Sequence, residues 1–317
     1  MLEITTGKML EITTGKMTLR LSRPVIGASG AFGFAGEYGK LLDLSLLGAL
    51  VTNPISLKAR RAASGTRVVP LDSGVLIHTG LPNGGIHKMH RQHAAKWRTS
   101  PIPVIMHLIG APEDLAECAA FLDQQAEIAA IELGINDTLT ARETRTTVAT
   151  VRTRTQLPLL VKLPLYQAVN LAAAAADGGA DALVIAAPPR GTARDPLSGQ
   201  LIGGRVYGAW LKPLAVRVVG QLTPRLSIPI IGCGGIHHPD DARDFFEAGA
   251  RAVQLDSVVW ARPEMVIAIA KAFSGGELTR MSGALADEWR PLGEPAERRT
   301  TLIPAPPPPH VPSPPEI

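Results

Sequence analysis

The stretch SIPIIGCGGIHHPDDARDFFEAGARAVQLDS, residues 227–257, decides the fold. It predicts a buried strand, a turn at Gly234 and Gly235, a helix that begins after Pro239, and a second buried strand. Glycines at the carboxyl end of a parallel strand let backbone N–H groups approach an anion, because no Cβ stands in the way. A tight turn without a ligand is the alternative, and the motif alone does not separate the two.

Apolar runs typical of buried strands alternate with helical stretches along the chain. The alternation predicts a closed parallel (β/α)8 barrel, the TIM barrel, because each run is apolar on both faces. An open doubly wound sheet is the alternative, but its glycine fingerprint would follow the first strand. Two longer connections, 53–85 and 188–204, leave from strand ends, and the first predicts an active-site loop or inserted hairpin. The strands are predicted at residues 25–28, 49–52, 103–108, 130–133, 159–163, 182–186, 228–231 and 252–255.

The two ends of the chain are predicted to lie outside the barrel. Residues 1–16 are the sequence MLEITTGK written twice, which is typical of a duplicated coding segment, so we expect them to be unstructured. Residues 17–275 are expected to form the barrel. Residues 276–317 include a proline-rich run and are expected to be a disordered tail, with binding to a proline-reading partner as the alternative.

Composition excludes several classes of protein. The 317 residues are 45% apolar with a formal charge of +4, and their basic residues are scattered, so no nucleic-acid partner is expected. Cys118 and Cys233 have neither disulfide nor metal-ligand spacing. The sequence shows no apolar run of membrane-spanning length and no signal-peptide layout. We therefore expect a cytoplasmic protein without a metal site or a membrane partner.

Short motifs spread along the chain carry a family resemblance. They are ASGAFG at 28–33, LGALVT at 47–52, GLPN at 80–83, VK at 161–162, LKP at 211–213, IIGCGGI at 230–236 and AVQ at 252–254. In order and spacing these motifs resemble the dihydroorotate dehydrogenase family, most closely its soluble class 1 members, over residues 19–273. The resemblance implies an FMN-bearing (β/α)8 barrel that oxidises dihydroorotate to orotate in pyrimidine biosynthesis, with a tendency to form a homodimer.

The same resemblance implies where FMN would bind. Lys162 matches a lysine at the pyrimidine edge of the flavin, where a fixed ammonium stabilises the negative charge of the reduced form. A surface lysine is the alternative. The other cofactor-binding positions are predicted at strand ends: Ala28, Ser29, Gly30, Thr52, Asn53, Gly208, Gly234, Gly235 and Ser257.

The positions that would hold the substrate depart from the family pattern. The catalytic cysteine motif after the fourth strand is replaced by GINDTL at 134–139, so Asp137 stands at the position of the cysteine base. Each replacement removes a hydrogen-bonding group aimed at a planar substrate, which costs about 1 kcal/mol or more in a buried site. The replacements are Asn53, His78, Gly134, Asp137, Leu139, Ala187 and Pro188.

Asp256 is a further departure, at a position where the family usually has glycine beside the phosphate. A carboxylate there weakens FMN binding unless its side chain points away from the phosphate.

Asp137 and His78 are the candidates for rebuilt catalytic groups, because a carboxylate and an imidazole can both take a proton. The alternative for Asp137 is a turn or helix-cap residue. His107 either lines the pocket or is a satisfied core residue. Three histidines at helical spacing predict a solvated helix face and not a metal site: His87, His90 and His93.

Three functions remain open from the sequence. The first is an FMN-dependent oxidoreductase of this family that acts on an altered small-molecule substrate with an unknown electron acceptor. The second is a catalytically inactive barrel that acts as an interaction or regulatory protein. The third is a non-redox barrel that binds a phosphorylated metabolite at Gly234 and Gly235. The absorbance of a bound flavin separates the first from the other two.

Overall fold

The computed structural model describes residues 10–14, 17–35, 37–39 and 41–274. The proline-rich segment and the first copy of the N-terminal repeat lie outside these residues, so the expected disorder of residues 276–317 stays a prediction. No helix in the described ranges is long and apolar enough to cross a bilayer.

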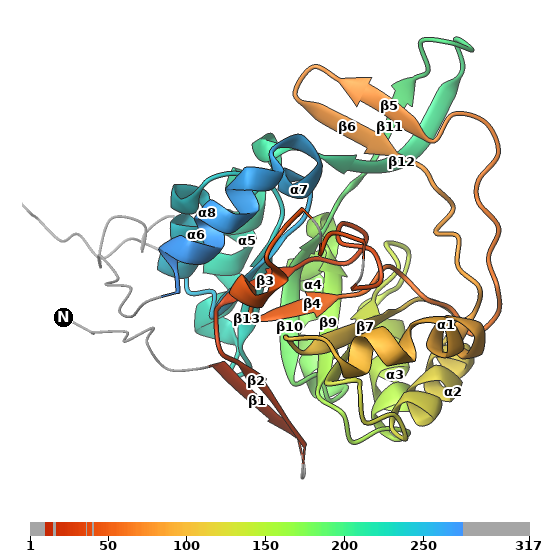
Figure 1. The fold of residues 1–317 in the computed structure, drawn as a ribbon, viewed down its shortest axis with the longest axis vertical. Helices are drawn as coiled ribbons and strands as arrows, with labels where there is room; N and C mark the ends of the chain where they lie inside the picture. The colour runs from red at the N-terminus through yellow and green to blue at the C-terminus, as the bar shows by residue number, and fades with distance from the viewer. Residues whose placement is uncertain (1–9, 15–16, 36, 40, 275–317) are drawn as a thin grey trace, which may run out of the picture. The chain divides into compact units, whose positions relative to one another are not determined.

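Eight parallel strands close into a barrel (Figure 1). Their order around the barrel is β3-β4-β7-β8-β9-β10-β13-β14. All eight overlap the predicted runs, and the (β/α)8 prediction is confirmed. Their residues are buried almost throughout, as expected for strands with helices outside and side chains filling the interior. The bounds are β3 (Val25–Gly27), β4 (Ala49–Val51), β7 (Val104–Leu108), β8 (Ala130–Gly134), β9 (Leu159–Pro164), β10 (Ala182–Ala187), β13 (Ile230–Cys233) and β14 (Ala252–Leu255).

Helices connect the strands on the outside of the barrel. The α-helices are α1 (Ile86–Arg98), α2 (Pro112–Leu122), α3 (Ala141–Arg152), α4 (Ala168–Asp177), α5 (Lys212–Leu222), α6 (Pro239–Glu247), α7 (Val258–Ala261) and α8 (Pro263–Ala272). Short 3-10 turns lie at Leu44–Leu46, Leu165–Gln167, Ala209–Leu211 and Thr223–Arg225.

Helix α6 begins where its sequence predicts. Pro239 occupies the first turn, where its missing N–H is not needed, and Asp240 and Asp241 follow in the same turn, where carboxylates suit the partial positive charge. On its inner face Phe245 is fully buried against Gly232 of β13, where an added Cβ would lie 2.3 Å from the ring. This packing sets the helix against the strand that leads into the glycine turn.

The N-terminal repeat is partly structured, which corrects the expectation for residues 1–16. Strand β1 (Leu10–Thr14), from the second copy of the repeat, pairs antiparallel with β2 (Met17–Leu21). The side chains that alternate onto one face are buried and join the barrel core, because the pattern of the hairpin has the period of two of a half-buried strand. These side chains are Leu10, Ile12, Leu19 and Leu21.

The two long connections meet in a second sheet of four antiparallel strands, in the order β11-β12-β6-β5 (Figure 1). The first connection forms the predicted hairpin, β5 (Val68–Leu71) with β6 (Gly74–Ile77), and the second forms β11 (Arg190–Arg194) with β12 (Leu201–Tyr207). Strand β12 also pairs with β6 and so joins the two insertions. A small core holds them together: Val69, Leu76 and Val206.

Candidate functional site

Most of the predicted cofactor positions meet at the carboxyl ends of the barrel strands. Parallel strands of a closed barrel end on one rim, so residues far apart in the sequence come together there. Ser29 and Gly30 follow β3, Asn53 follows β4, and Lys162 lies near the end of β9. The phosphate-type positions follow the last two strands: Gly234, Gly235 and Ser257.

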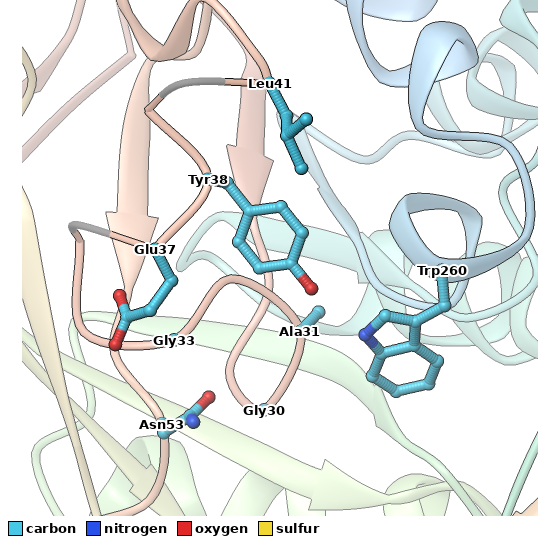
Figure 2. Close-up of a pocket in the computed structure, with 8 residues that line it drawn as sticks. All are labelled: Gly30, Ala31, Gly33, Glu37, Tyr38, Leu41, Asn53 and Trp260. Carbon is cyan, nitrogen blue, oxygen red and sulfur yellow. The ribbon is translucent and has the colours of Figure 1, made fainter.

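An open cavity of about 470 Å³ lies beside the turn that follows β3 (Figure 2). Gly30 has a φ of +82°, and an added Cβ would meet nothing within 4 Å, so the backbone is open there. Two buried polar atoms at this end, the Oγ of Ser29 and the Oδ1 of Asn53, have no hydrogen-bond partner among the described residues. The cavity is lined by Gly30, Ala31, Gly33, Glu37, Tyr38, Leu41, Asn53 and Trp260.

A chain of hydrogen-bonded polar groups crosses the interior of the barrel. The Nζ of Lys162 donates to Oε1 of Gln254 at 2.8 Å, and Nε2 of Gln254 donates to Oε2 of Glu132. The Oε1 of Glu132 accepts from Nδ1 of His107 at 2.7 Å. All four residues are buried, with Lys162 only 4% exposed, so the surface-lysine alternative is excluded.

The charges in this layer stabilise one another. Burial alone would raise the pKa of Glu132, but the charge of Lys162 and the hydrogen bonds from His107 and Gln254 lower it to about 2. Burial also opposes the charge on Lys162, yet Cys233 and then the carboxylates of Glu132, at 4.0 Å, and Asp256 raise its pKa above the usual value. The ammonium is therefore a fixed cation at neutral pH.

The glycine turn after β13 has the backbone that only glycine adopts easily. Gly234 and Gly235 have φ values of +114° and +74°. A Cβ on Gly235 would lie 2.4 Å from the backbone N of Lys212, whereas one on Gly234 would meet a single carbon at 3.8 Å. The turn is joined to the end of β14 because Nε2 of His237 and Oγ of Ser257 lie 2.9 Å apart.

Asp256 follows directly after β14 at this part of the rim. Its Oδ1 accepts from the backbone N–H of Ser257 at 2.5 Å and from the Ser257 hydroxyl at 3.1 Å. The residue is 2% exposed, and its buried Oδ2 has no partner among the described residues. The case in which this carboxylate points into solvent is therefore excluded.

Asp137 is held by two arginines of the second sheet. Its carboxylate accepts from Nη1 of Arg205 at 2.8 Å and from Nε of Arg190 at 3.1 Å, with a further contact to Nη2 of Arg205. Burial raises the pKa of Asp137, but Arg205 and then Arg190 outweigh it, so the pKa lies below its usual value. Asp137 is not the cap of α3, since Thr140 fills that role with Glu143 in a capping box. Its described contacts tie the loop after β8 to the second sheet.

The remaining predicted positions do not line the cavity of Figure 2. His78 is exposed and follows β6 on the second sheet. Gly208 permits a close backbone approach, because an added Cβ would lie 2.4 Å from the carbonyl oxygen of Ser73. Thr52 is buried and its Oγ1 accepts from the N–H of His107 at 3.2 Å, while Ala28 lies in the barrel core.

The histidines of α1 only partly fit the predicted solvated face. His87 is exposed, but His90 and His93 are partly buried. His90 lies 2.7 Å from Oε1 of Glu127, and His93 stacks on the rings of Phe34 and Trp97. Helix α1 therefore packs through aromatic contacts against the segment that carries part of the cavity. Within the described ranges no cluster of ligands could hold a metal ion.

Sequence reasoning missed Glu132 and Gln254 as members of the site. The signal was present, because a carboxylate and an amide stand inside the apolar runs AIELG and AVQL, where a polar group needs a partner. His107 also lies against Gly134, one of the positions that depart from the family pattern. An added Cβ on Gly134 would lie 2.8 Å from Nε2 of His107, so the glycine leaves room for the imidazole.

The fold is a (β/α)8 barrel, and the candidate site lies at the carboxyl ends of its strands. A sequence model of the family described as dihydroorotate dehydrogenase matches residues 11–274. The chain belongs to the dihydroorotate dehydrogenase family, and the resemblance drawn from the motifs is confirmed. Members of this family are oxidoreductases that carry FMN and act in pyrimidine biosynthesis.

Curated relatives agree with this assignment. The chain is 34% identical over 273 residues to the dihydroorotate dehydrogenase B (NAD(+)), catalytic subunit, of Geotalea daltonii, covering 80% of this chain and 88% of that protein. It is 35% identical over 266 residues to the protein of the same name from Pelobacter propionicus, covering 77% and 86%. The same subunit of Desulforudis audaxviator is 35% identical over 270 residues, covering 80% and 88%.

Proposed function

We propose that this chain is a flavin-dependent oxidoreductase of the dihydroorotate dehydrogenase family, with FMN as the cofactor that the family implies and an altered small-molecule substrate. The observation that carries the proposal is the ammonium of Lys162, fixed inside the barrel by Gln254 and Glu132. A buried cation at the strand ends stabilises negative charge on a ligand above it far better than an exposed cation would.

The ring end of the site suits a planar polar cofactor. The Ser29 hydroxyl can donate or accept, and Oδ1 of Asn53 requires a donor, so both unpartnered atoms can bind polar edges of a ring. Gly30 leaves the backbone open for close approach. A bound flavin supplies the hydride acceptor, and the residues of this chain hold it and exclude water. Where the phosphate would lie, Gly234 and Ser257 fit an anion but Asp256 opposes it.

The structure offers no strong proton acceptor at the expected position. A base works best when its pKa is near the working pH. The two arginines lower the pKa of Asp137 and so move it further from neutral pH. We therefore propose that dihydroorotate is turned over slowly or not at all. Steady-state assays of flavin-loaded protein test this, and rates within the ordinary enzyme range of roughly 1–1000 per second would contradict it.

We propose that the physiological acceptor is NAD(+) and that the chain works as the catalytic subunit of a larger enzyme. The support is the name shared by the relatives, which cover most of this chain. Homodimer formation and a cytoplasmic location stay predictions from the sequence. Purification of a tagged chain from its own cells, followed by light scattering and an NAD(+)-reduction assay of the complex, tests the assembly and the acceptor together.

A flavin-binding experiment tests the core of the proposal. Titration of the purified protein should quench flavin fluorescence, and Lys162→Gln should weaken binding about tenfold or more, since a charged hydrogen bond is worth roughly 1.5–3 kcal/mol. Lys88→Gln, which removes an exposed lysine of α1, is the matched control and should change nothing. Far-UV circular dichroism of each variant checks that the fold is kept. Absence of flavin binding by the unsubstituted protein would refute the proposed function.

A further inference from the structure

The last two strands of the barrel place the glycine turn and Asp256 side by side. Strands β13 and β14 are paired, with Cys233 opposite Gln254, and each turn follows directly. The contact between His237 and Ser257 joins the two turns. An anion that binds at the open face of Gly234 therefore approaches the hydrogen-bonding groups of Ser257.

Those groups of Ser257 are already used by the protein. Both its backbone N–H and its hydroxyl contact Oδ1 of Asp256, at 2.5 and 3.1 Å. An incoming phosphate needs donors of this kind, because its oxygens act as acceptors. The Asp256 carboxylate thus takes the role that a bound anion would otherwise fill.

The second carboxylate oxygen favours a donor over an anion. The Oδ2 of Asp256 is buried without a partner among the described residues, and an ionised carboxylate can only accept hydrogen bonds. A hydroxyl group satisfies such an atom, whereas a phosphate dianion brings acceptors and a like charge. The charge of Asp256 also acts on residues inside the barrel. It helps to raise the pKa of Lys162, and it adds to the effect of burial in raising the pKa of Tyr207.

Neighbouring cations do little to offset this carboxylate. Lys212, whose backbone lies against Gly235, is paired with Asp241 at 2.9 Å and Asp244 at 2.8 Å. Burial lowers the pKa of His237, which favours the neutral imidazole. Lys162, whose pKa Asp256 helps to raise, is already held by Gln254 and Glu132. The Nη2 of Arg262 donates to the carbonyl oxygen of His237 at 3.1 Å.

We propose that Asp256 makes this end of the site select against a phosphorylated ligand, so that the chain binds riboflavin at least as tightly as FMN. The inference rests on the flavin binding proposed above and names the residue that sets its specificity. A flavin whose side chain ends in a hydroxyl donates to Oδ2 of Asp256, whereas the phosphate of FMN must compete with Oδ1 for the donors of Ser257.

The test compares riboflavin and FMN by fluorescence titration of the full chain at one ionic strength. Asp256→Asn keeps the shape and removes the charge, and should shift the ratio of the two dissociation constants toward FMN by about tenfold or more. Asp256→Gly is a second variant with the same expectation. Asp240→Asn, which neutralises an exposed carboxylate of α6, is the matched control and should leave the ratio unchanged.

A second readout does not require flavin. Inorganic phosphate should raise the melting temperature of Asp256→Asn more than that of the unsubstituted protein, because the repelling charge is gone and a neutral amide oxygen competes less strongly for the donors of Ser257. The inference is overturned if the unsubstituted protein binds FMN more tightly than riboflavin, or if Asp256→Asn leaves the ratio of the two dissociation constants unchanged. Either result, with both flavins bound, leaves the proposed function intact, whereas binding of neither flavin by any variant overturns both.

Discussion

The two ends of the proposed flavin site hold buried carboxylates in opposite circumstances. Glu132 is fully buried, and each of its oxygens has a partner on another strand, with the ammonium of Lys162 nearby. Asp256 is almost as buried, but one of its oxygens has no partner among the described residues. A paired buried charge is part of a rigid scaffold, whereas an unpaired one awaits a partner from a ligand. Burial alone therefore does not distinguish a carboxylate with a structural role from one that binds a ligand.

The largest expected effect is the removal of the paired carboxylate. Glu132→Ala leaves Lys162 buried without its counter-charge, which should lower the free energy of unfolding by about 3–5 kcal/mol in urea denaturation. Glu117→Ala, at an exposed position of α2 beyond its first turn, is the control and should change it by less than about 0.5 kcal/mol. If Glu132→Leu combined with Lys162→Met were as unstable as Glu132→Ala, loss of packing or of the hydrogen bonds from His107 and Gln254, and not the unpaired charge, would explain the effect.

The pH dependence of stability sharpens the same contrast. The pKa of Glu132 is depressed from 4.5 to about 2 in the folded state, so its stabilisation is present above pH 4.5 and is lost as the pH falls toward 2. The shift corresponds to a loss on the order of 3 kcal/mol. Unfolding free energies measured from pH 7 to pH 2 should show this loss, and Glu132→Gln should flatten that part of the curve. An unchanged curve for the variant would contradict the assignment.

Asp137 is a paired carboxylate nearer to solvent, so its loss should cost less. Asp137→Asn keeps the shape but removes the charge that holds Arg190 and Arg205, and should lower the free energy of unfolding by about 1 kcal/mol. Any oxidoreductase activity of the protein should survive, because the expected role of Asp137 is structural. Steady-state rates and thermal melts of the variant measure both, and loss of turnover at unchanged stability would identify Asp137 as a base after all.

The smallest effect on stability, and one of opposite sign, is expected at the unpaired carboxylate. Asp256→Asn keeps an oxygen that can accept from Ser257 and removes a buried charge, so the free energy of unfolding should stay the same or rise by about 1 kcal/mol. Urea denaturation without ligand measures it. A loss of 2 kcal/mol or more would place Asp256 with Glu132 among the scaffold residues and remove the contrast.

The sequence was sufficient for the barrel but not for every part that packs on it. The apolar runs and the glycine turn were located within a few residues, because buried parallel strands have a composition of their own. The hairpin from the repeat was not predicted, because the repeat was interpreted as a duplicated coding segment. Its alternating apolar residues Leu10 and Ile12 join the core. The pairing of β6 with β12 could not be predicted, because it joins segments more than a hundred residues apart.

By itself the sequence determined the eight strands, the family, and the departures at Asp137 and Asp256, since each depends on residue type and order along the chain. Only the tertiary structure decided what those residues do. It gave Asp137 two arginines from another sheet, gave Lys162 a partner through Gln254, and left one oxygen of Asp256 without a partner among the described residues. The physical reason is that the charge and the hydrogen-bond donors of a side chain act on groups within a few ångströms. In a closed barrel, strand register and not distance along the sequence decides which groups those are.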